Sequence, residues 1–237
     1  METTSQSSAK LIEIQTLAKS YDQKLRQEFG DNALGMGGTL FLGKHYAKSD
    51  KIFFGLNPGT WKAEHRKQFE WWLHDANGPW GHPISKFRYW ENCSYFFAKS
   101  PPLGYWIEDA TSTFLIPWAS PSLSKLWRNR KLAQRIYEYS GALVHKMIEH
   151  HQAKWLIVAG VITLRTLASP YFLNFPLDNQ TVVFHFHGTS YQPARNYQWH
   201  KVLYQQMVIY QVPHFSRANN KKALTTCALW LKEDISS

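Results

Sequence analysis

WLIVAG, residues 155–160, is the clearest indication of the fold class of this 237-residue chain. A continuous apolar run of this length is typical of a strand buried on both faces of a parallel sheet. Gly160 ends the strand, and the sequence predicts a helix from there through Leu167. Upstream, apolar residues at helical spacing predict a helix over residues 130–151. Helix, strand and helix in this order form the repeating unit of an α/β protein.

The same alternation continues on both sides of this unit. Apolar runs predict further strands at residues 51–55, 113–116, 181–186 and 206–212. Helical spacing predicts helices at residues 11–29 and 222–232 and a helix-like segment at residues 61–77. We therefore expect an α/β fold, a single-domain three-layer α/β/α sandwich with a mainly parallel central sheet.

The domain organisation follows from what the chain lacks. No internal repeat and no long Gly-, Pro- or Ser-rich linker divides it, so residues 11–237 are expected to form one domain after a flexible polar tail, residues 1–10. In a parallel α/β sheet the ligand lies at the carboxyl ends of the strands. The loops that follow the strands are therefore the candidate functional segments.

Composition and charge narrow the class of protein. The chain carries 27 Lys and Arg against 17 Asp and Glu, a net charge of +10, which favours polyanionic partners: nucleic acid first, an acidic membrane surface second. Its longest apolar run, Trp155 to Ile162, is far shorter than the roughly 20 residues that cross a bilayer. With 2 Cys and no secretory signal at METTSQSSAK, we expect a reducing, cytoplasmic compartment. We also expect a monomer.

Two loops after predicted strands carry polar side chains in rigid surroundings. The first, Gly55-Leu-Asn-Pro-Gly59, presents the amide of Asn57 between small or rigid neighbours. The second, Pro213-His-Phe-Ser-Arg-Ala-Asn219, presents the imidazole of His214 in the same way. Each string alone is only a turn, and an isolated His in a loop is more often structural than catalytic. Their order and placement along the chain are more informative.

Together with the strand at residues 155–160, these two loops resemble the motifs of the uracil-DNA glycosylase superfamily. The Asn-Pro-Gly of the first loop is most similar to the mismatch-specific and single-strand-selective monofunctional branches, and the second loop is more similar to the latter. The likeness covers roughly residues 40–232. It implies a four-stranded parallel sheet between helices and hydrolysis of the bond between a flipped base and its deoxyribose, without metal or organic cofactor.

The resemblance also implies a role for each matching residue. His214 would donate a hydrogen bond to the base oxygen that gains charge, and Asn57 would position the water that attacks C1′. Leu56, Pro58, Thr113 and Phe114 would line the base pocket. Arg217 and Ala218 would fill the space left by the flipped base. The residues expected to approach DNA phosphates are Gly59, Ser85, Ser216, Asn219, Asn220, Lys221 and Lys222.

The chain departs from the family pattern at two places. Relatives that bind uracil usually carry an Asn where this chain has Phe114, so either Ser112 or Thr113 partly replaces that amide or the base is not uracil. The second loop has Phe215 and Arg217 where the single-strand-selective branch has two prolines. The two cysteines exclude the iron–sulfur branches.

Histidines elsewhere in the chain have simpler interpretations. His185 and His187 share one face of a strand, but no third metal ligand follows at a fixed spacing. His145, His150 and His151 lie near the end of a predicted helix, where we expect them to interact with the negative pole of its dipole.

Two alternatives to a glycosylase stay open. One is a catalytically degenerate nucleic-acid-binding module on the same fold, which Phe114 favours. The other is an unrelated α/β enzyme that acts on a small molecule and has a basic surface. Single-stranded or mismatched DNA is the partner expected of a glycosylase, because its bases cost least to flip.

Overall fold

The computed structural model describes residues 4–34, 39–42, 49–56, 72–74, 110–118, 127–177, 182–186, 197–214 and 221–236. The strands are β1 (Thr39–Leu42), β2 (Lys51–Gly55), β3 (Trp72–His74), β4 (Thr111–Phe114), β5 (Trp155–Ala159), β6 (Val182–Phe186), β7 (Tyr197–Tyr204) and β8 (Met207–Val212). The helices of the described residues are α1 (Thr4–Phe29), the 3₁₀ turn η1 (Asp31–Ala33), α6 (Arg130–His151), α7 (Val161–Leu167) and α8 (Lys221–Ser236).

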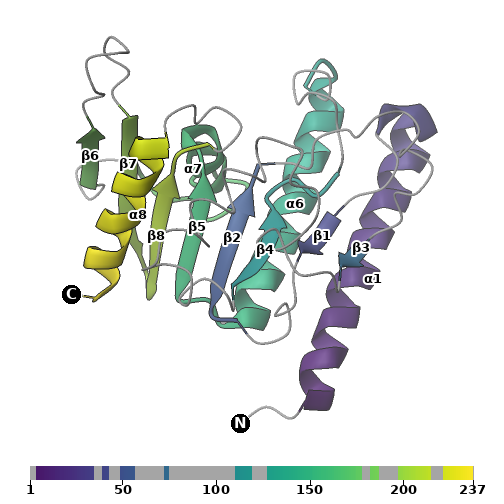
Figure 1. The fold of residues 1–237 in the computed structure, drawn as a ribbon. Coiled ribbons are helices and arrows are strands. Elements are labelled where there is room, and N and C mark those ends of the chain that lie inside the picture. The colour runs from purple at the N-terminus through teal and green to yellow at the C-terminus, as the bar shows by residue number, and fades with distance from the viewer. Residues whose placement is uncertain are drawn as a thin grey trace.

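The strands form one mixed, mostly parallel sheet in the order β3-β1-β4-β2-β5-β8-β7-β6 (Figure 1). Its centre, β4-β2-β5-β8, is parallel throughout. On one side β1 runs antiparallel to β4, and on the other β7 runs antiparallel to β8 and to β6. The expected mainly parallel α/β sheet is therefore present, and its four central strands all end at the same edge.

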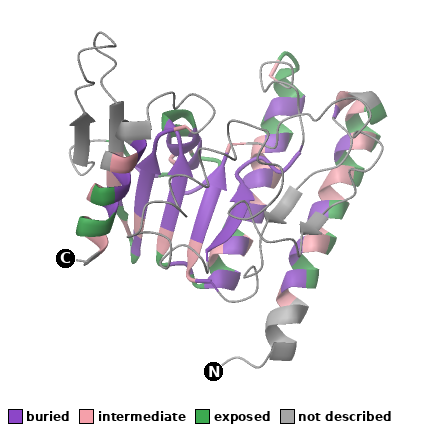
Figure 2. Ribbon diagram, viewed as in Figure 1, coloured by how far each residue is buried: buried purple, intermediate pink, exposed green. Residues whose placement is uncertain are grey.

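Helices α6 and α7 pack against one face of this sheet. The alternating strand residues Ile52, Phe54, Leu156 and Val158 point to that face and form a buried cluster with side chains of both helices. Their neighbours on the strands point to the other face, because side chains alternate along a strand. Almost the whole length of β2, β4, β5 and β8 is buried (Figure 2).

Helix α8 contacts the opposite face. Tyr210 of β8 donates a 2.6 Å hydrogen bond to Asp234 of α8, and its ring packs edge-on against Trp230 at 5.8 Å. Lys201 of β7, which pairs with Tyr210 in the antiparallel register, reaches the same carboxylate at 2.7 Å. The described helices therefore contact both faces of the sheet.

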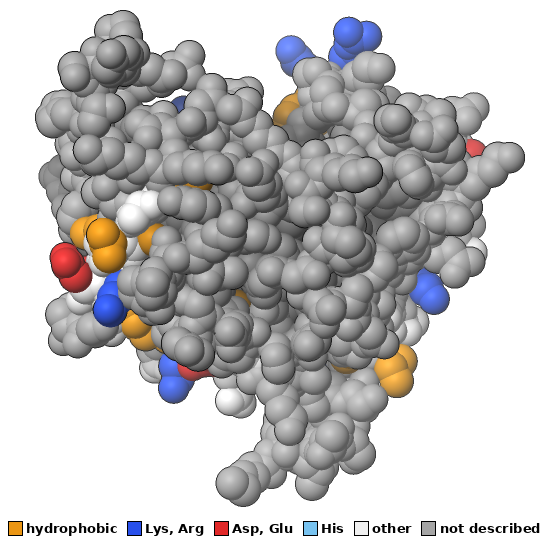
Figure 3. All heavy atoms as spheres, in the orientation of Figure 1, with side chains coloured by type: hydrophobic (Ala, Val, Ile, Leu, Met, Phe, Trp, Pro, Cys, Tyr) orange, Lys and Arg blue, Asp and Glu red, His pale blue; other side chains and the backbone are white. Residues whose placement is uncertain are grey.

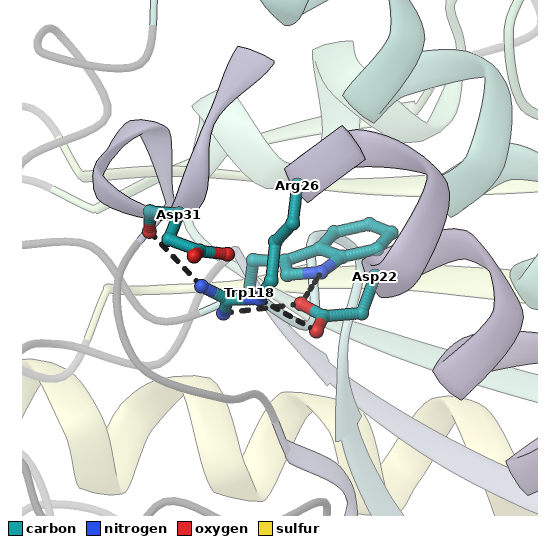
Figure 4. A network of polar contacts seen from close by, with 4 residues as sticks. All are labelled: Asp22, Arg26, Asp31 and Trp118. Atoms are coloured by element: carbon teal, nitrogen blue, oxygen red, sulfur yellow. Dashed lines mark hydrogen bonds and ion pairs between the residues drawn. The ribbon is translucent and has the colours of Figure 1, made fainter. Parts of the chain in front are cut away.

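Helix α1 packs on α6 through a second cluster. Leu11, Ile14, Ala18 and Leu25 of α1 are buried there with apolar residues of α6 and with Trp118. A network of polar contacts joins α1 to Trp118 and to η1 (Figure 4). Asp22 accepts hydrogen bonds from Arg26 and Trp118, and Arg26 donates to the backbone carbonyl of Asp31. The N-terminal helix is thereby attached to the segment that follows β4.

Most predicted elements are confirmed, and the differences have local reasons. The strand at residues 51–55, the helix at 130–151 and the strand ending at Ala159 are present as predicted. Helix α1 begins at Thr4 rather than at residue 11, because no Gly or Pro interrupts residues 4–10. The helix-like interpretation is wrong at residues 72–74, which form β3 paired with β1. Neither β1 nor β7 was predicted.

Candidate functional site

The carboxyl ends of the parallel strands bring three chain segments to one edge of the sheet. Leu56 follows β2, Gly160 follows β5, and His214 lies two residues beyond Val212, the end of β8. Strand β5 lies between β2 and β8. Two strand spacings correspond to about 10 Å. The loop after β2 and the segment that carries His214 therefore start about 10 Å apart, on either side of the end of β5.

The ends of β2 and β4 are joined by backbone hydrogen bonds. The N–H of Leu115 donates to the carbonyl of Gly55, and the N–H of Ile116 donates to the carbonyl of Leu56, both at 2.9 Å. Phe114 pairs with Gly55 in the register and is 7% exposed. The end of β4 beside the start of the Leu56 loop is therefore occupied by a buried apolar ring.

Ser112 and Thr113, which precede Phe114 on β4, are both buried. The hydroxyl of Thr113 donates to the sulfur of Met147 on α6 at 3.8 Å, which places it on the α6 face of the sheet. Ser112 points to the other face, because side chains alternate along β4. Of the two hydroxyls considered as replacements for an amide, that of Thr113 is directed at α6.

The ends of β5 and β8 are held together at one carbonyl. The oxygen of Val212 accepts a 2.8 Å hydrogen bond from the backbone N–H of Gly160 and a 2.7 Å hydrogen bond from the side-chain amide of Gln211. The amide oxygen of Gln211 in turn lies 2.7 Å from Nδ1 of His200, which donates to it. Gln211 is 2% exposed, so this network fixes the strand end inside the protein.

Gly160 lies directly against His214. Its backbone is in the left-handed region, with φ at +88°, where a side chain is strained. A Cβ at this position would lie 2.9 Å from Cβ and 3.1 Å from Cδ2 of His214. His214 itself is partly exposed. The imidazole of His214 is therefore packed against the turn that follows β5.

Apolar side chains are exposed next to this contact. Val161 and Ile162, the first residues of α7, are 40% and 54% exposed. They follow Gly160 directly, so they lie at the same edge of the sheet as His214. The described part of the site thus combines one imidazole with apolar surface, a combination that suits a planar ligand with a polar edge.

Only part of the predicted site is described. Leu56, Thr113, Phe114 and His214 are brought to the carboxyl ends of the four parallel strands. Lys221 and Lys222 form the first turn of α8, where the structure describes the backbone. The predictions for Asn57, Pro58, Gly59, Ser85, Ser216, Arg217, Ala218, Asn219 and Asn220 lie outside the described residues.

Sequence reasoning did not assign roles to Gly160 or Gln211. The sequence marks Gly160 as the end of a strand, which is a usable signal, but it does not show that His214 packs on it. Nothing in the sequence distinguishes Gln211 from other polar residues near a strand end. Both assignments depend on the pairing of β5 with β8.

The helix-end histidines differ from what was expected. His150 and His151 are buried, with ring centroids 4.8 Å apart. Burial, and then the neighbouring His150, lowers the pKa of His151 to about 3, against the effect of a hydrogen bond with the Ser49 backbone. His151 is thus neutral near pH 7. The prediction that it interacts as a cation with the helix dipole is wrong.

The described residues offer no dedicated metal centre and no membrane span. Among them, His, Cys, Asp and Glu do not gather in threes at distances suited to a metal ion. No helix in the described ranges is both long and apolar enough to cross a bilayer. In the view of Figure 3, the coloured Lys and Arg side chains lie at separate places around the edge of the molecule.

No protein-family model matches this chain, and no curated protein matches it significantly.

Proposed function

We propose that the protein is a monofunctional DNA glycosylase, which hydrolyses the N-glycosidic bond of uracil or of another deaminated or damaged base in base excision repair. One observation carries the proposal. The loop that begins at Leu56 and the imidazole of His214 start from the carboxyl ends of β2 and β8, on either side of β5. In this proposal a flipped base lies beyond the end of β5, between two segments that start about 10 Å apart.

The reaction assigns a distinct task to each of the two groups. The bond between C1′ and the base nitrogen breaks, and its electron pair leaves with the base. His214 donates a hydrogen bond to the base oxygen on which this charge collects. Asn57 orients a water whose oxygen bonds to C1′, and the proton that this water loses passes to solvent. An amide suits this task, because the water needs placement more than deprotonation.

The sheet and the charge support the same proposal. Helices contact both faces of a mostly parallel sheet, as in the three-layer α/β/α sandwich that we propose for the whole domain. The net charge of +10 favours DNA over neutral ligands. We further propose that the protein acts as a monomer in the cytoplasm, and that it acts on single-stranded or mismatched DNA, whose bases cost least to flip.

A second candidate is a DNA-binding module that retains the fold without catalysis. Phe114 favours it, because a ring that is 7% exposed occupies the strand end where an amide would bind uracil. Such a module would bind DNA in a salt-dependent manner and release no base.

The test is base release from labelled oligonucleotides that contain uracil, hypoxanthine, xanthine or hydroxymethyluracil, both single- and double-stranded. We expect the wild type to release at least one base, and Asn57→Ala or His214→Ala to lower turnover by ~100-fold or more. Both variants should still bind abasic DNA. The control variant is His145→Ala, which removes an exposed imidazole on α6 and should keep full activity.

The other outcomes separate the candidates. Salt-dependent DNA binding without release of any base would replace the glycosylase by the binding module. Equal activity of the wild type and both site variants would overturn the roles of Asn57 and His214. Neither binding nor release would leave only an enzyme that acts on a small molecule.

A further inference from the structure

We propose that Gly160 is a positioning residue for His214: it gives the imidazole a flat surface to pack on and so sets the direction of its Nε2. The inference rests on the proposed function for its effect on catalysis. The contact itself does not, because it is a property of the folded chain. Gly160 belongs to the turn after β5, and His214 to the segment after β8.

Hydrogen bonds hold the backbones of the two segments together, independently of the contact between Gly160 and the imidazole. The N–H of Gly160 donates to the carbonyl of Val212 at 2.8 Å, and Gln211 donates to the same oxygen at 2.7 Å. Only Pro213 separates Val212 from His214, and Pro213 is buried. Since proline also restricts its own backbone, the Cα of His214 has little freedom relative to Gly160.

The remaining freedom of His214 is rotation of its ring, and Gly160 limits it. A Cβ on Gly160 would lie 2.9 Å from Cβ and 3.1 Å from Cδ2 of His214. Cδ2 is bonded to Nε2, so a contact at Cδ2 restricts where Nε2 can point. Any side chain at position 160 would push the ring away or force it out of its staggered rotamer. Glycine is therefore needed for the direction of the imidazole as well as for the turn.

Gly30 separates these two requirements, because it has nearly the same backbone conformation. Its φ and ψ are 85° and 157°, against 88° and 153° for Gly160, and each residue directly precedes a helical segment. A Cβ on Gly30 would meet nothing within 4 Å. Gly30→Ala thus introduces the backbone strain alone, whereas Gly160→Ala introduces the strain and the collision with His214.

The experiment compares these two variants by NMR of the histidine ring nitrogens and by the kinetics of base release. The His214 signals are assigned by their loss in His214→Ala. We expect both glycine variants to lower the melting temperature. Only Gly160→Ala should shift the His214 signals, and it should lower kcat at least ~10-fold more than Gly30→Ala with little change in KM. Unshifted His214 signals in folded Gly160→Ala would overturn the proposal.

A double substitution covers the case in which Gly160→Ala fails to fold. His214→Gly removes the three side-chain atoms that the new Cβ would meet, Cβ, Cγ and Cδ2. Gly160→Ala/His214→Gly should therefore regain melting temperature relative to Gly160→Ala, while adding His214→Gly to Gly30→Ala should give no such gain. Absence of that gain would overturn the proposal. If His214 signals shift as expected but the wild type releases no base, the positioning contact stands and the proposed function fails.

Discussion

The indole Nε1 of Trp118 donates a 3.1 Å hydrogen bond to Oδ1 of Asp22, across 96 residues of sequence. The same carboxylate accepts from Arg26 at 2.8 and 3.3 Å, and Arg26 also donates to the carbonyl of Asp31 at 3.0 Å (Figure 4). Trp118 is fully buried just beyond β4. One carboxylate therefore joins the N-terminal helix to the end of a central strand.

Removing this carboxylate should destabilise the fold. Asp22→Ala leaves the buried indole N–H without this acceptor, and we expect the free energy of unfolding in urea to fall by about 2 kcal/mol. The control is Glu138→Ala, which breaks an exposed pair with Arg135 and should cost no more than about 0.5 kcal/mol. Equal losses in the two variants would contradict an anchoring role for Asp22.

A second carboxylate, Asp234, should hold α8 on the sheet. It accepts from the hydroxyl of Tyr210 at 2.6 Å and from Lys201 at 2.9 Å, and Tyr210 is 1% exposed. Burial, and then the bond to Asp234, raises the pKa of Tyr210. In Asp234→Ala we expect faster amide hydrogen exchange throughout α8. We also expect the free energy of unfolding to fall by about 1–3 kcal/mol. Glu233 is the exposed neighbour of Asp234, and the control variant Glu233→Ala should show the amide hydrogen exchange of the wild type in α8.

The buried His151 should make the fold sensitive to acid. Its pKa is about 3 in the folded protein, below the ordinary 6.5, so the unfolded chain binds a proton that the folded chain does not. The stabilisation is complete above pH 6.5 and is lost as the pH falls from 6.5 toward 3. The slope contributed by one such group is at most roughly 1.4 kcal/mol per pH unit.

Urea unfolding at a series of pH values tests this dependence. His151→Phe should flatten the acid limb of the stability profile relative to the wild type, because the variant has no imidazole to protonate in the unfolded state. An unchanged acid limb in His151→Phe would show that other groups cause it.

Phe114 should decide which base is accepted, if the proposed glycosylase activity holds. Phe114→Asn places a donor and an acceptor at the end of β4, where they can pair with the edge of uracil. We expect the ratio of uracil release to hypoxanthine release to rise at least ~10-fold. The ratio does not depend on the folded fraction of the variant. Phe114→Leu removes the ring without adding an amide, and an equal rise there would contradict the prediction.

The periodicity of the sequence predicted the elements that depend on local signals. Trp155–Ala159 and Arg130–His151 were located correctly, because a continuous apolar run and an amphipathic stripe are both visible within one element. Periodicity did not predict β3, which pairs with β1, or β7, which pairs with β6 and β8. β3 has only three residues, and β7, YQWHKVLY, shows no regular alternation of polar and apolar side chains, so neither strand has a clear pattern of its own.

The amino-acid sequence was enough to predict an α/β sheet and two loops after strands, one with an amide and one with an imidazole. These conclusions need only apolar patterns, Gly and Pro, which act over a few residues. Only the folded structure shows that β5 lies between β2 and β8, that Gly160 packs on His214, and that Trp118 bonds to Asp22. Strand order and packing depend on contacts between distant segments, and a local pattern does not encode them.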